Sequence, residues 1–303
     1  MRHAFFVVVC LTFSVNASEN LSDHAQYCAP VAAQNCGDYL QQQLTALTPY
    51  SSAWYRVKAY QLNYLFDKHQ FQQLNTEAEQ LLQQPNLPEV LRVQLYFYYA
   101  KTLFYFEQRD EAKHYAKLAL AMLEDVYHAF GNPLRLVELA NLHYSLGELE
   151  QAGQLLQVAQ SRYQKSKDPQ FSFELNSNLA LVAHQRGDLD AAAAYRNEAL
   201  TAASALGHPN KIIVAMGNLA RTRQLLGQLQ QALQLYQDSL QFTATAEHRV
   251  QHQIHLLRLA EISLQLQQPA QARTYLQQVI PEQLGPGHQQ LYQQLATALE
   301  QNP

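Results

Sequence analysis

Apolar residues recur at helical spacing over most of the chain, and the stretch Asn176–Leu200 shows the pattern most clearly. Leu179 and Ala180 fall on the inner face of a first predicted helix, and Ala192 falls on the inner face of a second. Gly187 stands between the two helices, where it marks a tight turn. The stretch therefore predicts a helical hairpin, which is a pair of antiparallel helices joined by a short turn.

The same hairpin recurs every 40 residues. The turn position holds Glu107, Gly147, Gly187, Gly227 and Gln267. The position seven residues earlier holds Ala100, Ala140, Ala180, Ala220 and Ala260, and the position five residues later holds Ala112, Ala152, Ala192, Ala232 and Ala272. A third position holds Ala119, Ala159, Ala199, Ser239 and Val279. Small residues let antiparallel helices pack closely, so the repeat predicts a stacked array of hairpins.

Helices are also predicted on both sides of the strict repeat. The pattern indicates a helix over 31–47, a degenerate first hairpin over 54–67 and 71–83, and a last helix over 288–301 that caps the array. The predicted fold is therefore all-α, with an N-terminal segment over 18–52 and a solenoid over 53–303. The solenoid units are expected near 53–92, 93–132, 133–172, 173–212, 213–252 and 253–285, followed by a cap over 286–303.

The residues that define the unit resemble the tetratricopeptide repeat. The pattern of LA, then GD-L-x-A, then AL is clear in this stretch and also in GNLARTRQLLGQLQQAL and ANLHYSLGELEQAGQLL. The 40-residue unit is similar to the longer variant of kinesin light chains and bacterial peptide-pheromone receptors. The resemblance covers about residues 53–292, although Glu107 and Gln267 replace the turn glycine. It implies a right-handed superhelix whose first helices line a concave groove that binds a peptide or another protein.

Three positions on the first helices are predicted to face this groove. One holds Asn178 and Asn218, and in the peptide-binding proteins that the chain resembles such an asparagine reaches the ligand backbone. The alternative is that each asparagine bonds to its own neighbouring helix. The second position holds Lys101, Asn141, Leu181, Arg221 and Glu261, and the third holds Phe104, Tyr144, His184, Gln224 and Leu264. The predicted partner-binding residues are Asn178, Asn218, Arg221, His184, Asn141, Tyr144, Lys101 and Phe104. The aromatic members either anchor a partner's apolar side chains or fill space between helices.

A second constellation consists of His248, His252 and His255, which fall on one face of a predicted helix. Histidines four residues apart can bind zinc or copper, so these three are candidate metal ligands. They straddle a junction between repeats, and no carboxylate completes the set at the same spacing except Glu247. The sequence therefore favours no metal and no other cofactor.

Residues 1–17 have the three regions of a signal peptide. Arg2 gives a positive start, the apolar run Ala4–Phe13 is too short to span a bilayer, and Ala17 precedes a predicted cleavage site. The alternative is a buried N-terminal strand. Cleavage after Ala17 would give an exported protein, and the expected location is the periplasm.

Two cysteines remain after cleavage, Cys28 and Cys36. On one helix they would lie about 12 Å apart, which is too far for a bond. Pro30 can begin a helix and leave Cys28 in the preceding loop, so a disulfide is predicted. The alternative is two free thiols.

Composition and charge narrow the function further. The chain of 303 residues has a net charge of −4, which gives no general attraction for nucleic acid, and no later apolar segment is long enough to span a membrane. Phosphate-binding loops and the motifs HExxH, GxSxG and CxxC are absent from the sequence, so a non-enzyme is predicted.

The sequence as a whole predicts an exported adaptor or scaffold that binds another protein or an extended peptide in its concave groove, without catalysis. The alternative is an envelope sensor of a small molecule or metal that acts in trans through a partner protein. Low net charge and glutamine-rich outer faces also permit homo-oligomers.

Overall fold

The computed structural model describes residues 28, 35–130, 133–245 and 248–301, and these residues form α-helices with no strand among them. In chain order the helices are α2 (Cys36–Ala46), α3 (Ser52–Asp67), α4 (Phe71–Leu82), α5 (Glu89–Tyr105), α6 (Arg109–Phe130), α7 (Pro133–Leu146), α8 (Leu149–Arg162), α9 (Pro169–Gln185), α10 (Leu189–Leu206), α11 (Pro209–Leu225), α12 (Leu229–Thr243), α13 (Arg249–Gln265), α14 (Pro269–Leu276) and α15 (Pro286–Gln301). A short 3₁₀-helix, η3 (Pro281–Gln283), precedes α15. The predicted signal peptide lies outside the described residues.

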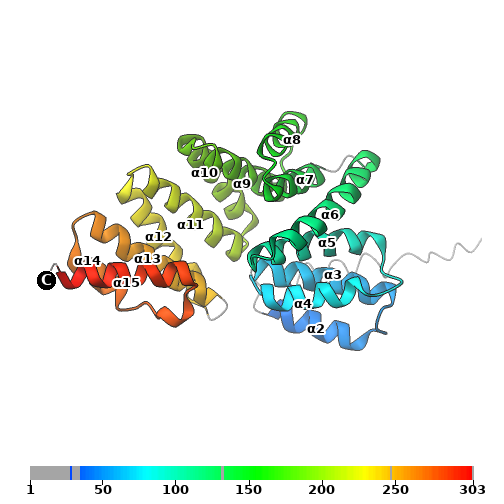
Figure 1. Ribbon diagram of the computed structural model, residues 1–303, viewed down its shortest axis with the longest axis horizontal. Coiled ribbons are helices and arrows are strands. Elements are labelled where there is room, and N and C mark those ends of the chain that lie inside the picture. Colours follow the sequence, from blue (N-terminus) through cyan, green and yellow to red (C-terminus); the bar gives the residue numbers. More distant parts are fainter. Residues whose placement is uncertain (1–27, 29–34, 131–132, 246–247, 302–303) are drawn as a thin grey trace, which may run out of the picture.

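Consecutive helices pair into six antiparallel hairpins, from α3–α4 to α13–α14, and α15 packs on the last pair. Figure 1 shows that the hairpins follow an arc in which α7–α10 connect an N-terminal group, α2–α6, with a C-terminal group, α11–α15. Each hairpin packs on the next one, so the hydrophobic core runs along the array as a series of overlapping clusters. The predicted all-α solenoid with a capping helix is confirmed.

The small-residue positions lie between the two helices of each hairpin, as the spacing predicts. All ten alanines of the first two positions are fully buried, with at most 1% of their surface exposed. The third position is also buried from Ala119 to Val279. Leucines complete the core beside these alanines, and Leu103, Leu142 and Leu156 are among the most deeply buried. The close approach of the paired helices thus depends on the absence of side-chain volume at the repeated positions.

The turn positions share one backbone conformation. Residues 107, 147, 187, 227 and 267 all have a positive φ, between 59° and 84°. Glycine adopts this left-handed conformation without steric cost, whereas the Cβ atoms of Glu107 and Gln267 do not. In the central hairpin, the amides of Gly187 and Asp188 donate to the carbonyls of His184 and Ala183, each at 3.0 Å, which ends α9.

Local signals also set the joins between hairpins. The side chain of Asp168 accepts a hydrogen bond from the amide of Gln170 at 2.9 Å, and Pro169 occupies the first position of α9. Gly207 ends α10 with a φ of 63°, and Pro209 begins α11. The stop signal at Gly131–Asn132 lies outside the described residues.

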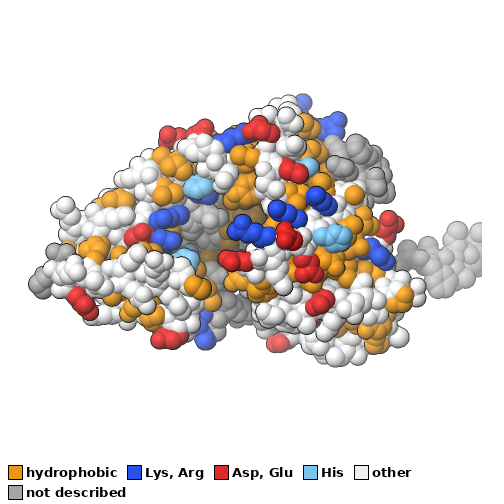
Figure 2. Space-filling view, viewed as in Figure 1, with side chains coloured by type: hydrophobic (Ala, Val, Ile, Leu, Met, Phe, Trp, Pro, Cys, Tyr) orange, Lys and Arg blue, Asp and Glu red, His pale blue; other side chains and the backbone are white. Residues whose placement is uncertain are grey.

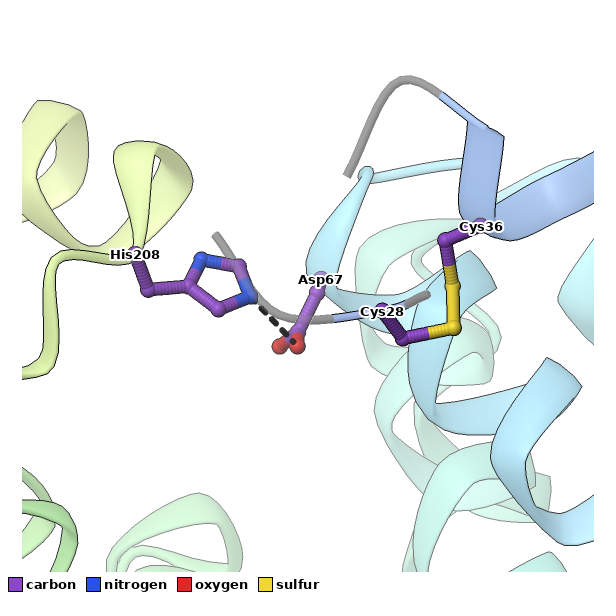
Figure 3. Close-up of a disulfide and its surroundings, with 4 residues drawn as sticks. All are labelled: Cys28, Cys36, Asp67 and His208. Atoms are coloured by element: carbon purple, nitrogen blue, oxygen red, sulfur yellow. Dashed lines mark ion pairs between the residues drawn. A yellow bond between two sulfur atoms is a disulfide. The ribbon is translucent and has the colours of Figure 1, made fainter. Parts of the chain in front are cut away.

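The N-terminal helix is shorter than the sequence pattern indicates. The α-helix α2 begins at Cys36 and ends at Ala46, whereas the pattern predicts 31–47; residues 29–34 are not described. A disulfide joins Cys28 to Cys36 and packs beside Tyr39, Leu40 and Val57 (Figure 3). Because Cys36 is the first residue of its helix, the chain can turn back and bring the two Cα atoms to 4.6 Å.

The alanine positions give a direct test of the hairpin packing. We expect Ala180→Leu or Ala192→Leu to lower the free energy of unfolding by about 1–3 kcal/mol, because neither site has room for the added volume. Chemical denaturation monitored by circular dichroism measures this change. The control is Ala194→Leu on the exposed face of α10, which should change stability by less than about 0.5 kcal/mol. Equal stability of all three variants would contradict the packing.

The turn positions give a second test, with the opposite sign. We expect Gln267→Gly to raise the free energy of unfolding by up to about 1 kcal/mol, because glycine removes the steric cost of a positive φ. Gly187→Ala should lower it by about 1 kcal/mol for the same reason. The same denaturation experiment measures both variants, and a stability change of the same sign in both would rule out the turn geometry.

Candidate functional site

Polar side chains on the first helices connect successive hairpins along the array. Asn141 of α7 donates to the side chain of Asn178 on α9. Arg221 of α11 lies 3.6 Å from Glu261 of α13, and Gln224 donates to Gln265 at 3.1 Å. The sequence positions predicted to face a groove therefore form a polar ladder between hairpins.

The two asparagines predicted to bind a ligand have different surroundings. Asn178 is buried, accepts the hydrogen bond from Asn141, and donates to the carbonyl of Glu174 at 2.8 Å. Asn218 is exposed, and its side chain has no hydrogen bond among the described residues. The residue 37 positions before Asn178 is Asn141, whereas the residue 37 positions before Asn218 is Leu181, which cannot form a hydrogen bond. Of these two asparagines, Asn218 therefore offers the free amide.

The N-terminal candidates lie mostly within the core. Phe104 packs against the clusters of the first and second hairpins, and Tyr144 packs against the cluster of the third. The ammonium group of Lys101 donates to Ser145 Oγ at 2.5 Å, and burial lowers the pKa of Lys101 to about 7. These contacts correspond to the space-filling alternative for the aromatic residues, and a binding role for them stays a prediction.

A cationic region surrounds His184 in the middle of the array. Arg196 of α10 is buried and donates to the carbonyl of Asn218 at 3.0 Å and to Thr222 Oγ1. Burial, followed by the charges of Arg196 and Arg221, lowers the pKa of His184. Arg196 thus fixes the backbone of α11 at Asn218 from the neighbouring hairpin.

A hollow of about 260 Å³ lies between α11 and α13 beside this region. Its lining comprises Ile213, Val214, Gly217, Asn218, Arg221, Tyr236, Gln251, Ile254, His255, Arg258 and His288. Two of the predicted groove residues, Asn218 and Arg221, therefore lie at one site. Figure 2 shows cationic and histidine side chains around the hollowed middle of the molecule.

The charge of the hollow is positive. Arg221 and Arg258 both pair with Glu261, at 3.6 Å and 2.8 Å, so two guanidinium groups share one carboxylate. Burial, followed by the charges of these arginines, lowers the pKa of His288, which keeps this histidine neutral near pH 7. An anionic group is the ligand chemistry that suits the remaining positive charge.

The hollow exists because one position of the repeat lacks a side chain. Gly217 stands where other units have Phe97, Val137, Ser177 and Leu257. A Cβ atom at Gly217 would lie 2.9 Å from His255 Nε2, so the two helices approach closely around the hollow. A glycine within a predicted helix signals such an approach.

Sequence reasoning missed Arg258 and His288. Arg258 could have been found, because it stands 40 residues after Asn218 in the same repeat position. His288 had no such signal, because α15 lies outside the repeat.

The three candidate metal ligands pack separately against α12 and its connection to α13. His252 Nδ1 lies 2.8 Å from Thr243 Oγ1, and His255 Nδ1 lies 2.6 Å from Ser239 Oγ. His248 precedes the first turn of α13 and is buried. Within the described parts of the chain, no group of three His, Cys, Asp or Glu side chains could hold a metal ion. Likewise, none of the described helices combines the length and apolar character needed to cross a membrane.

The two asparagines should respond differently to substitution. We expect Asn178→Ala to lower the free energy of unfolding by about 1–3 kcal/mol, because Asn141 loses its partner in a buried place. Asn218→Ala should change it by less than about 0.5 kcal/mol, since that side chain is exposed. Urea denaturation separates the two outcomes, and an equal loss in both variants would contradict the difference.

His255 should make stability depend on pH. Burial, with a smaller effect of His252, lowers the pKa of His255 to about 4, below its ordinary value of 6.5. The neutral form is therefore favoured in the folded state, so this stabilisation is complete above pH 6.5 and is lost as the pH falls toward 4. We expect a loss of up to about 3 kcal/mol from this group.

Urea denaturation between pH 7 and 4 measures this loss. His255→Gln should remove that part of the pH dependence, whereas His114→Gln, at an exposed position of α6, should not. An unchanged pH profile in His255→Gln would show that the histidine does not control it.

Comparison with known proteins identifies the repeat. Residues 171–244 match the family model described as tetratricopeptide repeat, and no curated protein matches the sequence.

Three solved structures with the same fold illustrate the likeness. The structure of NprR in complex with its cognate peptide NprX is 13% identical, covers 94% of this chain and 82% of its own, and has a TM-score of 0.54. The Rap protein complexed with Competence and Sporulation Factor is 17% identical, with coverages of 93% and 79% and a TM-score of 0.56. BtubC from P. vanneervenii is 13% identical, with coverages of 77% and 91% and a TM-score of 0.52. At these identities the likeness concerns the fold alone.

Proposed function

Because the chain carries tetratricopeptide repeats, we propose that it is an exported binding module that holds a peptide, or an extended segment of another protein, in the hollow between α11 and α13. The bound segment carries an acidic group. The module has no catalytic activity of its own and acts through its partner, as an adaptor or scaffold in the periplasm.

The observation that carries this proposal is the pairing of Asn218 with Arg221 at the hollow. The amide of Asn218 can donate to and accept from a ligand's peptide backbone, because no described residue uses it. Arg221 can approach an acidic side chain or terminus, since it shares its carboxylate partner with Arg258. A backbone contact beside a charge contact suits an extended peptide.

Two further observations support a ligand in this place. NprR and the Rap protein, which share the fold, were each solved with a bound partner, and for NprR that partner is a peptide. The backbone of Asn218 is also held in place by Arg196, so the amide is oriented before any ligand arrives. Export rests on the N-terminal sequence, with its short apolar run and the small residue Ala17 before the predicted cleavage site.

A peptide display library panned on the immobilised mature protein tests the proposal. We expect enriched peptides to contain Asp or Glu, and we expect the double variant Asn218→Ala with Arg221→Ala to bind them at least about tenfold more weakly, which corresponds to about 1.4 kcal/mol. Fluorescence polarisation measures the affinities.

The matched control is Asn197→Ala with Arg249→Ala, which removes the same two residue types from exposed positions on α10 and α13. Peptides that bind the double variant and the wild type equally would reject the site, and a library without enrichment would reject the function.

A further inference from the structure

Beyond the hollow, a set of polar contacts joins parts of the chain that are far apart in sequence. Asn210 Nδ2 donates to the carbonyl of Asp67 at 2.6 Å, across 143 residues, and His208 Nε2 lies 3.5 Å from a carboxylate oxygen of Asp67 (Figure 3). Gln251 Nε2 lies 3.4 Å from His69 Nδ1, across 182 residues. We call these five residues the clasp.

The clasp closes the curve of the solenoid. Asp67 is the last residue of α3, and His69 lies in the turn that leads to α4, at the tip of the first hairpin. His208 and Asn210 begin α11, and Gln251 lies in the first turn of α13. The clasp therefore joins the first hairpin to the fifth and sixth, and the C-terminal group of helices in Figure 1 meets the N-terminal group here.

This contact differs in kind from the contacts between successive hairpins. Successive hairpins share apolar clusters, whereas no cluster among the described residues joins α3 or α4 to α11 or α13. Two buried atoms of the clasp, His208 Nδ1 and Asn210 Oδ1, also lack a protein hydrogen-bond partner in the described chain. A contact without apolar burial, and with unsatisfied polar atoms, contributes little to global stability.

The electrostatics of the clasp favour the closed arrangement over a random encounter. Burial raises the pKa of Asp67, but the hydrogen bond from His208 and the charge of Lys211 outweigh burial, so its pKa is lowered. Lys211 is itself bound to Glu174 at 3.1 Å. Asp67 also contacts residues at the N-terminus of α11, where the helix dipole favours negative charge. Asp67 is thus held as an anion at the start of α11.

We propose that the clasp is a conformational latch: it holds the solenoid in the closed curve seen here, and its release lets the hairpins spread and widens the concave side. Each hairpin keeps its own apolar core during this motion, because the alanine positions are not part of the clasp. The latch is independent of the ligand proposed above, so its test needs no ligand and can fail separately.

Small-angle X-ray scattering of the full mature chain, together with thermal unfolding, tests the latch. We expect His208→Ala with Asn210→Ala to increase the radius of gyration and the maximum dimension, while helicity is retained and the melting temperature falls by less than about 4 °C. Asp67→Lys acts from the other side of the clasp by placing like charge against Lys211, and it should produce the same expansion.

The control is His143→Ala with Glu148→Ala, which removes a histidine–carboxylate pair of 2.6 Å within the single hairpin α7–α8. It should leave the radius of gyration unchanged. Wild-type dimensions in both clasp variants would overturn the latch. Loss of helicity in both would also overturn it, because the contacts would then belong to the core.

Discussion

The close approach of antiparallel helices at positions that carry almost no side chain is the constraint on which this structure depends. Ala180 and Ala192 of the central hairpin are buried to within 1% of their surface, and their counterparts in the other strict repeats are buried as completely. A methyl group at each position lets the helices meet, and leucines beside it supply the apolar surface. Because the constraint recurs every 40 residues, each hairpin presents the same face to the next, and the chain curves into a solenoid.

The candidate site arises where one unit departs from this pattern. Gly217 removes the side chain that its counterparts Val137 and Leu257 supply, and the hollow opens between α11 and α13. Asn218 and Arg221 line it, and Arg258 adds a second guanidinium group that Glu261 neutralises only in part. The polar ladder elsewhere on the first helices satisfies its own hydrogen bonds, so the departure of one unit distinguishes a surface that can bind from one that only holds hairpins together.

Most of the fold could be predicted from spacing, because local turn chemistry and small-residue positions are periodic signals. The turn at Gly187 and the capping helix before Gln301 are examples. The difference between Asn178 and Asn218 was not predicted, because it depends on the facing residue of the preceding unit, Asn141 in one case and Leu181 in the other. The clasp at Asp67 and His208 was beyond sequence reasoning, since it depends on the accumulated curvature of the hairpins between them.

The central claim is that the departure at Gly217 creates the ligand seat. A crystal structure of the mature chain with a peptide enriched on it tests this claim most directly. The account predicts that the peptide lies between α11 and α13, with its backbone on the amide of Asn218 and an acidic group beside Arg221. A peptide bound on the convex side or against α15, with the hollow unoccupied, would contradict it.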